Sequence, residues 1–197
     1  MTDGPDGGEV ITPSQTVGPF FAYCLTPSAY KYRQVFSSDL TAHGAEGRRI
    51  HIEGRVLDGD GELVPDAIIE IWQADAAGAY ARADQGANAA FRGFGRAECD
   101  GEGRFAFTTV KPGRVPGPGG ASQAPHINVG VFARGLLKRL FTRIYFADEA
   151  NEADPILALV PEGRRPTLMA EPSSAGSTHY TFDIRLQGDA ETVFFEA

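Results

Sequence analysis

The chain has 197 residues, of which 42% are hydrophobic and 22% charged, and it contains 24 glycines and 13 prolines. This length can bury a substantial core and most simply forms a single domain over 1–197. The many glycines and prolines favour short strands joined by turns. The formal net charge of −8 argues against nucleic-acid binding, which needs a surplus of lysine and arginine to neutralise phosphates.

The sequence also lacks the marks of a membrane or secreted protein. No apolar run approaches the length of a membrane span, and the N-terminus has no basic segment followed by an apolar one. Cys24 and Cys99 are too few and too far apart for a disulfide scaffold. We therefore expect free thiols and a cytoplasmic location.

Hydrophobic patterning in chain order predicts strands rather than helices. Residues 1–11 are rich in glycine and aspartate and should form a flexible N-terminal arm, and the prolines at 13 and 19 predict an extended turn. Alternating or continuous apolar residues predict strands over 50–57, 67–72, 104–110, 140–146 and 180–187, with 191–195 pairing beside the last. Residues 112–125 read as a long Gly/Pro loop, and 148–153 as a short helical turn.

These patterns together predict an all-β fold. Strands recur at regular spacing, turn signals lie between them and little of the chain favours helix. We expect a two-layer β-sandwich of largely antiparallel strands with long connecting loops. Trp72 and Phe182 lie in apolar strand contexts and should belong to its core.

The stretch from Pro125 to Phe146 carries the main chemical signal. It opens as a strand in which apolar residues at 127, 129 and 131 alternate with other types, and Gly135 then interrupts the run. His126 and Asn128 are two residues apart, so their side chains project from one face of the sheet. Two histidines at this spacing could bind one metal ion, but the second position here is an amide.

Seven sequence blocks carry a resemblance to a known family. They are TPSQTVGPF (12–20), GRVLDGDG (54–61), EIWQAD (70–75), VKPG (110–113), APHIN (124–128), FARG (132–135) and FDIRLQG (182–188). With these blocks the chain resembles the intradiol ring-cleaving dioxygenases from residue 12 to near its end. Within that family it is most similar to the non-iron chain of the heteromeric members. The resemblance implies two packed, largely antiparallel sheets with long loops that carry the site.

The same resemblance allows the metal ligands to be checked. Catalytic chains of the family hold Fe(III) with two tyrosines and two histidines, and the hard phenolate anion stabilises the ferric state. His126 falls on the first histidine position, Asn128 on the second and Val115 on one tyrosine position. The other tyrosine is expected in the loop downstream of Tyr80, where none follows before residue 91. We therefore predict no metal site and no catalytic residue in this chain, and a structural role for His126.

The resemblance implies instead a heteromeric enzyme, in which a homologous beta chain binds Fe(III) and this chain closes one side of the substrate cleft. The implied reaction cleaves protocatechuate, 3,4-dihydroxybenzoate, with O2 between the two hydroxyl-bearing carbons to give 3-carboxy-cis,cis-muconate. The isolated chain should be inactive. A free-standing catechol dioxygenase is disfavoured because it would need the missing ligands. A non-enzymatic β-sandwich carrier or binding module stays open as the alternative.

Two stretches match the implied substrate-binding role. The first is the turn that contains Thr16, Gly18, Pro19 and Phe20, whose family counterpart reaches the mouth of the active site. Phe20 replaces a tyrosine often found there, and the turn could merely pack on the partner. The second is Arg134, because a guanidinium fork matches the two oxygens of a benzoate carboxylate. Its alternative is a solvated turn arginine.

Overall fold

The described part of the chain is built around one continuous β-sheet. The computed structural model describes residues 25–42, 44–81 and 91–196, and the predicted arm over 1–11 lies outside them. Nine of the described strands form the sheet. They are β1 (Arg49–Leu57), β2 (Ile68–Gln73), β3 (Phe94–Glu98), β4 (Arg104–Val110), β7 (His126–Phe132), β8 (Leu140–Phe146), β9 (Met169–Pro172), β10 (His179–Thr181) and β11 (Ile184–Arg185).

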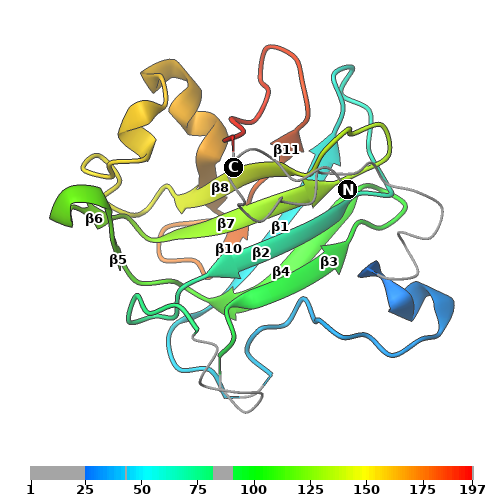
Figure 1. The fold of residues 1–197 in the computed structure, drawn as a ribbon, viewed down its shortest axis with the longest axis horizontal. Coiled ribbons are helices and arrows are strands. Elements are labelled where there is room, and N and C mark those ends of the chain that lie inside the picture. Colours follow the sequence, from blue (N-terminus) through cyan, green and yellow to red (C-terminus); the bar gives the residue numbers. More distant parts are fainter. Residues whose placement is uncertain (1–24, 43, 82–90, 197) are drawn as a thin grey trace, which may run out of the picture.

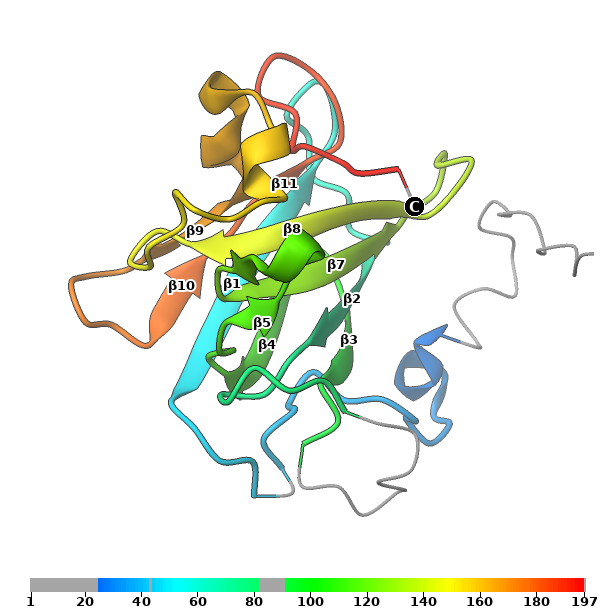
Figure 2. The same ribbon diagram turned by 60° about the vertical axis from the view of Figure 1, so that its left-hand side comes forward.

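The sheet bends round on itself and is nearly closed. Its hydrogen-bonded order is β4–β1–β10–β9–β8–β7–β2–β3, with β11 pairing with β1 beyond β10. The end strands β3 and β4 contact each other, which gives a sandwich-like shape (Figures 1 and 2). Most neighbours are antiparallel, and β1 with β10, β1 with β11 and β8 with β9 are the parallel pairs. The predicted all-β sandwich is confirmed.

The main core lies between the inward faces of these strands. Ile50, Ile52 and Val56 of β1 are buried, whereas the residues between them are mostly exposed, as expected for a strand with one face on the core. Alternate residues of β7 are buried in the same cluster, as is Phe182, which confirms its predicted core position. Burial of these apolar side chains supplies the main driving force for folding.

Short elements occupy the predicted loops. Residues 112–125 contain the small hairpin of β5 (Val115–Pro116) and β6 (Ser122–Gln123), with the 3-10 helix η3 (Pro118–Gly120) between them. The other 3-10 helices described are η1 (Pro27–Tyr30), η4 (Leu157–Leu159) and η5 (Glu162–Leu168). None of the described helices is long and apolar enough to cross a membrane.

Two sequence-based expectations about these segments were wrong. Residues 148–153 form turns, and the helical segment begins later. The cause is Asp154, whose Oδ1 accepts hydrogen bonds from the amides of Ile156 and Leu157 and so caps the turn that follows. The predicted strand over 180–187 is divided into β10 and β11 at Phe182–Asp183. There the amide of Arg55 donates its hydrogen bond to the side chain of Asp183.

A test of the packing at this division uses Gly54 on β1. A Cβ added there would lie 1.7 Å from the carbonyl oxygen of Phe182. We expect Gly54→Ala to lower the free energy of unfolding by about 3 kcal/mol, because the backbone must shift to relieve the overlap. Urea unfolding measures this loss. Gly101→Ala is the control, since a Cβ there meets no atom within 4 Å. Equal stability of the two variants would contradict the packing described.

Candidate functional site

Polar and aromatic side chains gather on the outer face of the sheet formed by β2, β7 and β8. Trp72 pairs in register with Asn128, and Asn128 pairs with Arg143 on the next strand. These three residues alternate with core residues on their strands, so their side chains project away from the main core. The register of three antiparallel strands therefore builds one row across the outer face.

Tyr80 joins this row through a tight turn that follows β2. The carboxylate of Asp75 accepts hydrogen bonds from the amides of Ala77 and Ala79, which folds the chain back. Gly78 has a φ of 82°, and a Cβ there would lie 1.9 Å from the carbonyl oxygen of Arg114, so the turn requires glycine. The returning chain stacks the Tyr80 ring on Trp72 with 5.8 Å between ring centroids.

Three side chains meet at the Tyr80 hydroxyl. The Tyr80 oxygen lies 3.4 Å from Nε2 of His126 and 3.2 Å from Nδ2 of Asn128. Asn128 also directs Nδ2 to the carbonyl oxygen of Trp72, at 3.3 Å, which fixes the amide with its nitrogen toward the tyrosine. We call Tyr80, His126 and Asn128 the outer-face triad.

The protons of the triad can be assigned from its neighbours. Nδ1 of His126 lies 2.8 Å from the carbonyl oxygen of Ala124, which can only accept, so Nδ1 carries a hydrogen. In the neutral ring Nε2 then has a lone pair that accepts from the Tyr80 hydroxyl. His126 is 2% exposed, and this burial is the main cause that lowers its pKa below the ordinary 6.5. The triad is therefore a hydrogen-bonded network, and the structural role of His126 stays a prediction.

The spacing of the triad resembles half of a metal centre. The Tyr80 oxygen and His126 Nε2 lie 3.4 Å apart, and these are the two members of the triad that could act as donors to a metal ion. The third member, however, presents an amide N–H, which cannot bind a cation. Val115 is buried and carries no donor. A phenol and one imidazole do not suffice to hold Fe(III), so iron does not fit these residues.

The structure adds one residue that the sequence reasoning missed and corrects another. Tyr80 was passed over because its tyrosine position was sought further along the loop, and residues 82–90 of that loop lie outside the described residues. The Asp-x-x-Gly turn just before Tyr80 was the signal that could have found it. Trp72 is not a core residue, because it lies on the outer face and is 38% exposed.

Of the predicted substrate-binding residues, the structure describes Arg134, which lies away from the triad. Arg134 lies at the far end of β7, two residues beyond its last residue Phe132 and eight beyond its first residue His126. Its side chain is 76% exposed, and its Nε donates to Oδ2 of Asp66. Thr16, Gly18, Pro19 and Phe20 lie outside the described residues.

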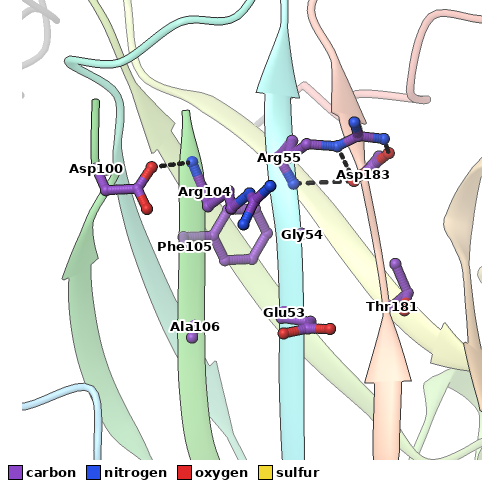
Figure 3. A pocket seen from close by; sticks show the side chains of 9 residues that line it. All are labelled: Glu53, Gly54, Arg55, Asp100, Arg104, Phe105, Ala106, Thr181 and Asp183. Carbon is purple, nitrogen blue, oxygen red and sulfur yellow. Dashed lines mark hydrogen bonds and ion pairs between the residues drawn. The ribbon is translucent and has the colours of Figure 1, made fainter. Parts of the chain in front are cut away.

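A hollow of about 540 Å³ elsewhere on the sheet is a second candidate (Figure 3). It lies over β1 and β4 and is open to solvent. Two of its charged groups already have partners: Arg55 is 2.7 Å from Asp183, and Arg104 is 3.1 Å from Glu102. We assign it no function.

Comparison with known proteins identifies the family. A family model described as "Dioxygenase" matches residues 16–188. The chain belongs to this family. The resemblance to the intradiol dioxygenases, which are iron-dependent oxidoreductases, is thereby confirmed.

Individual relatives of this dioxygenase chain agree. It is 47% identical over 194 residues to the protocatechuate 3,4-dioxygenase alpha chain of Burkholderia cepacia, covering 94% of this chain and 96% of that one. It is 37% identical over 154 residues to the beta chain from the same organism, covering 72% and 66%. The solved dioxygenase domain of a carbohydrate-binding fusion protein from Streptomyces sp. SirexAA-E gives a TM-score of 0.59 at 26% identity, covering 90% of this chain and 98% of that chain.

The triad predicts what one substitution would do. Asn128→His replaces the amide with a third donor beside Tyr80 and His126, and we expect the variant to retain stoichiometric iron with a visible tyrosinate-to-iron absorption band. Asn128→Ala, which removes the amide without adding a donor, is the control and should stay colourless. Metal analysis and absorption spectra after reconstitution with ferric iron measure both. A colourless, iron-free Asn128→His variant would show that the three positions do not converge.

Proposed function

We propose that this chain is the non-iron-binding alpha subunit of a protocatechuate 3,4-dioxygenase. The enzyme would cleave 3,4-dihydroxybenzoate with O2 between its hydroxyl-bearing carbons to give 3-carboxy-cis,cis-muconate. The observation that carries this proposal is the triad, in which the amide of Asn128 leaves only Tyr80 and His126 as donors for a metal that needs more. Val115, at the expected position of a second tyrosine, adds no donor. The match to an alpha chain over 94% of the sequence supports the proposal.

The iron belongs, in this proposal, to a homologous beta subunit. A beta chain that is 37% identical to this one must have the same fold, so the two subunits would assemble as similar partners in a hetero-oligomer. The ferric ion would supply the activation of the catechol ring toward O2. This chain would contribute the walls of the substrate cleft. The free thiol of Cys99 supports a cytoplasmic location, where thiols remain reduced.

Arg134 is the side chain of this subunit that we assign to the substrate. Its exposed guanidinium lies on a turn at the end of a strand, where it can reach across to a partner. Protocatechuate carries a carboxylate opposite its catechol edge, and a guanidinium binds such a group through two parallel hydrogen bonds. The turn over Thr16, Gly18, Pro19 and Phe20 is proposed to line the same cleft.

Production of the chain alone and together with its beta chain tests the assignment. We expect iron, the tyrosinate-to-iron absorption and loss of protocatechuate only in the complex. Stoichiometric iron or turnover by the lone chain would overturn the proposal. A stable, colourless chain that forms no complex with the beta chain would instead favour a non-enzymatic binding module.

Substitution of Arg134 in the complex tests its role. Arg134→Ala should raise the KM for protocatechuate by about tenfold and leave kcat nearly unchanged, because one charged hydrogen-bonding group is lost. The KM for catechol, which lacks the carboxylate, should not change. Arg104→Ala is a matched control, since it removes an exposed arginine elsewhere. An unchanged KM for protocatechuate would show that Arg134 does not bind the substrate.

A further inference from the structure

The backbone of Arg134 is held by a tight turn. Its neighbour Ala133 is fully buried, and the amide of Leu136 donates to the carbonyl oxygen of Ala133 at 3.3 Å. Gly135 adopts a φ of 84°, the left-handed region that the third residue of a type II turn requires. Arg134 is the second residue of this turn. Its Cα is therefore fixed relative to the core, although its side chain is exposed.

Strand register places Asp66 opposite this turn. Ile68 of β2 pairs with Phe132 of β7 in an antiparallel ladder. Asp66 precedes Ile68 by two residues and Arg134 follows Phe132 by two, so the ladder brings them side by side. Asp66 lies in its own turn, in which the amide of Ala67 donates to the carbonyl oxygen of Val64 at 3.4 Å. The backbone of both Arg134 and Asp66 is thus held by a hydrogen-bonded turn.

The contact between the two side chains uses only one edge of the guanidinium. Oδ2 of Asp66 lies 2.5 Å from Nε of Arg134, and the Asp66 side chain is 32% exposed against 76% for Arg134. Within the described ranges, the two terminal nitrogens of Arg134 make no hydrogen bond to the protein. These nitrogens form the edge that faces solvent, which is the edge that would meet a carboxylate end-on.

We propose that Asp66 is a positioning residue for substrate binding. By binding Nε it holds the Arg134 guanidinium in one orientation, with the terminal nitrogens directed to the carboxylate of an aromatic acid in the partner's cleft. This inference rests on the proposed function, because it assumes that Arg134 binds the substrate. An exposed ion pair adds little to stability. Its effect here is to restrict a long flexible side chain before the substrate arrives, which lowers the entropy lost on binding.

The negative charge of Asp66 should weaken substrate binding, whereas positioning of Arg134 should strengthen it. The two effects can therefore be told apart. A carboxylate close to Arg134 weakens the attraction of the guanidinium for a second carboxylate. If charge alone mattered, any neutral replacement of Asp66 would lower the KM for protocatechuate. If positioning matters, the amide of asparagine can still accept from Nε, whereas alanine cannot.

The test measures steady-state kinetics of the assembled complex with protocatechuate and with catechol. Asp66→Ala should raise the KM for protocatechuate about fivefold, leave kcat within about twofold and not affect catechol. Asp66→Asn should remain near the wild type. In an Arg134→Ala background, Asp66→Ala should add nothing, because the side chain that it orients is gone. Glu102→Ala, which breaks another exposed pair, is the control, and unchanged thermal unfolding of each complex excludes a folding defect.

The outcomes separate the two claims. An effect of Arg134→Ala without an effect of Asp66→Ala would overturn the positioning role and leave the proposed function intact. A lowered KM for protocatechuate in both Asp66 variants would show that Asp66 acts through its negative charge and not by positioning Arg134. An Asp66→Ala effect that persists in the Arg134→Ala background would show that Asp66 acts through another group. No effect of Arg134→Ala would remove the substrate role of Arg134, and the positioning role with it.

Discussion

The antiparallel register of β2, β7 and β8 is the constraint on which the rest of the structure depends. Because side chains alternate along each strand, one pairing sends Ile127 and Val129 into the core and His126 and Asn128 to the outer face. A shift of one residue would exchange these sets and expose the core. The free energy of apolar burial thus holds the polar row in place, although the row contributes little to that burial.

The outer-face triad satisfies its polar groups through hydrogen bonds among its own members and the backbone. Burying a polar group costs free energy unless the group makes a hydrogen bond. His126 meets this demand with a carbonyl oxygen on one nitrogen and a hydroxyl on the other, and Tyr80 both donates and accepts. The amide of Asn128 completes the set. The N–H of Asn128 thus satisfies a lone pair of the Tyr80 oxygen, and the Tyr80 hydroxyl satisfies that of His126 Nε2.

The sequence predicted the elements whose pattern is local and missed those set by distant contacts. Strands β1, β4 and β8 were found within a residue of their bounds, because alternation is visible along the chain. Strand β3, which contains Gly95, was not among the predicted strands. In the fold Gly95 lies against Leu40 and the carbonyl oxygen of Ser37, where a Cβ would not fit. That requirement comes from a segment far away in the sequence.

The residues of the candidate site likewise fall into those predicted from local spacing and those set by distant contacts. His126 and Asn128 were found because two residues on one strand share a face. Tyr80 reaches them only through the turn at Asp75, and Arg134 meets Asp66 across 68 residues of chain. Trp72 sits in an apolar run, yet that run faces the core at alternate positions only. Side-chain partners created by strand register cannot be read from spacing within one segment.

The amide at residue 128 also bears on how an assembly of two homologous chains would acquire its metal. Two competent centres in one complex would compete for scarce ferric iron, and partial filling of both would leave many molecules with the ion in the wrong subunit. If this chain binds no iron, as proposed above, it is no competitor. Every ion captured would then go to the subunit that uses it, so the metal content of the complex would report its number of working sites directly.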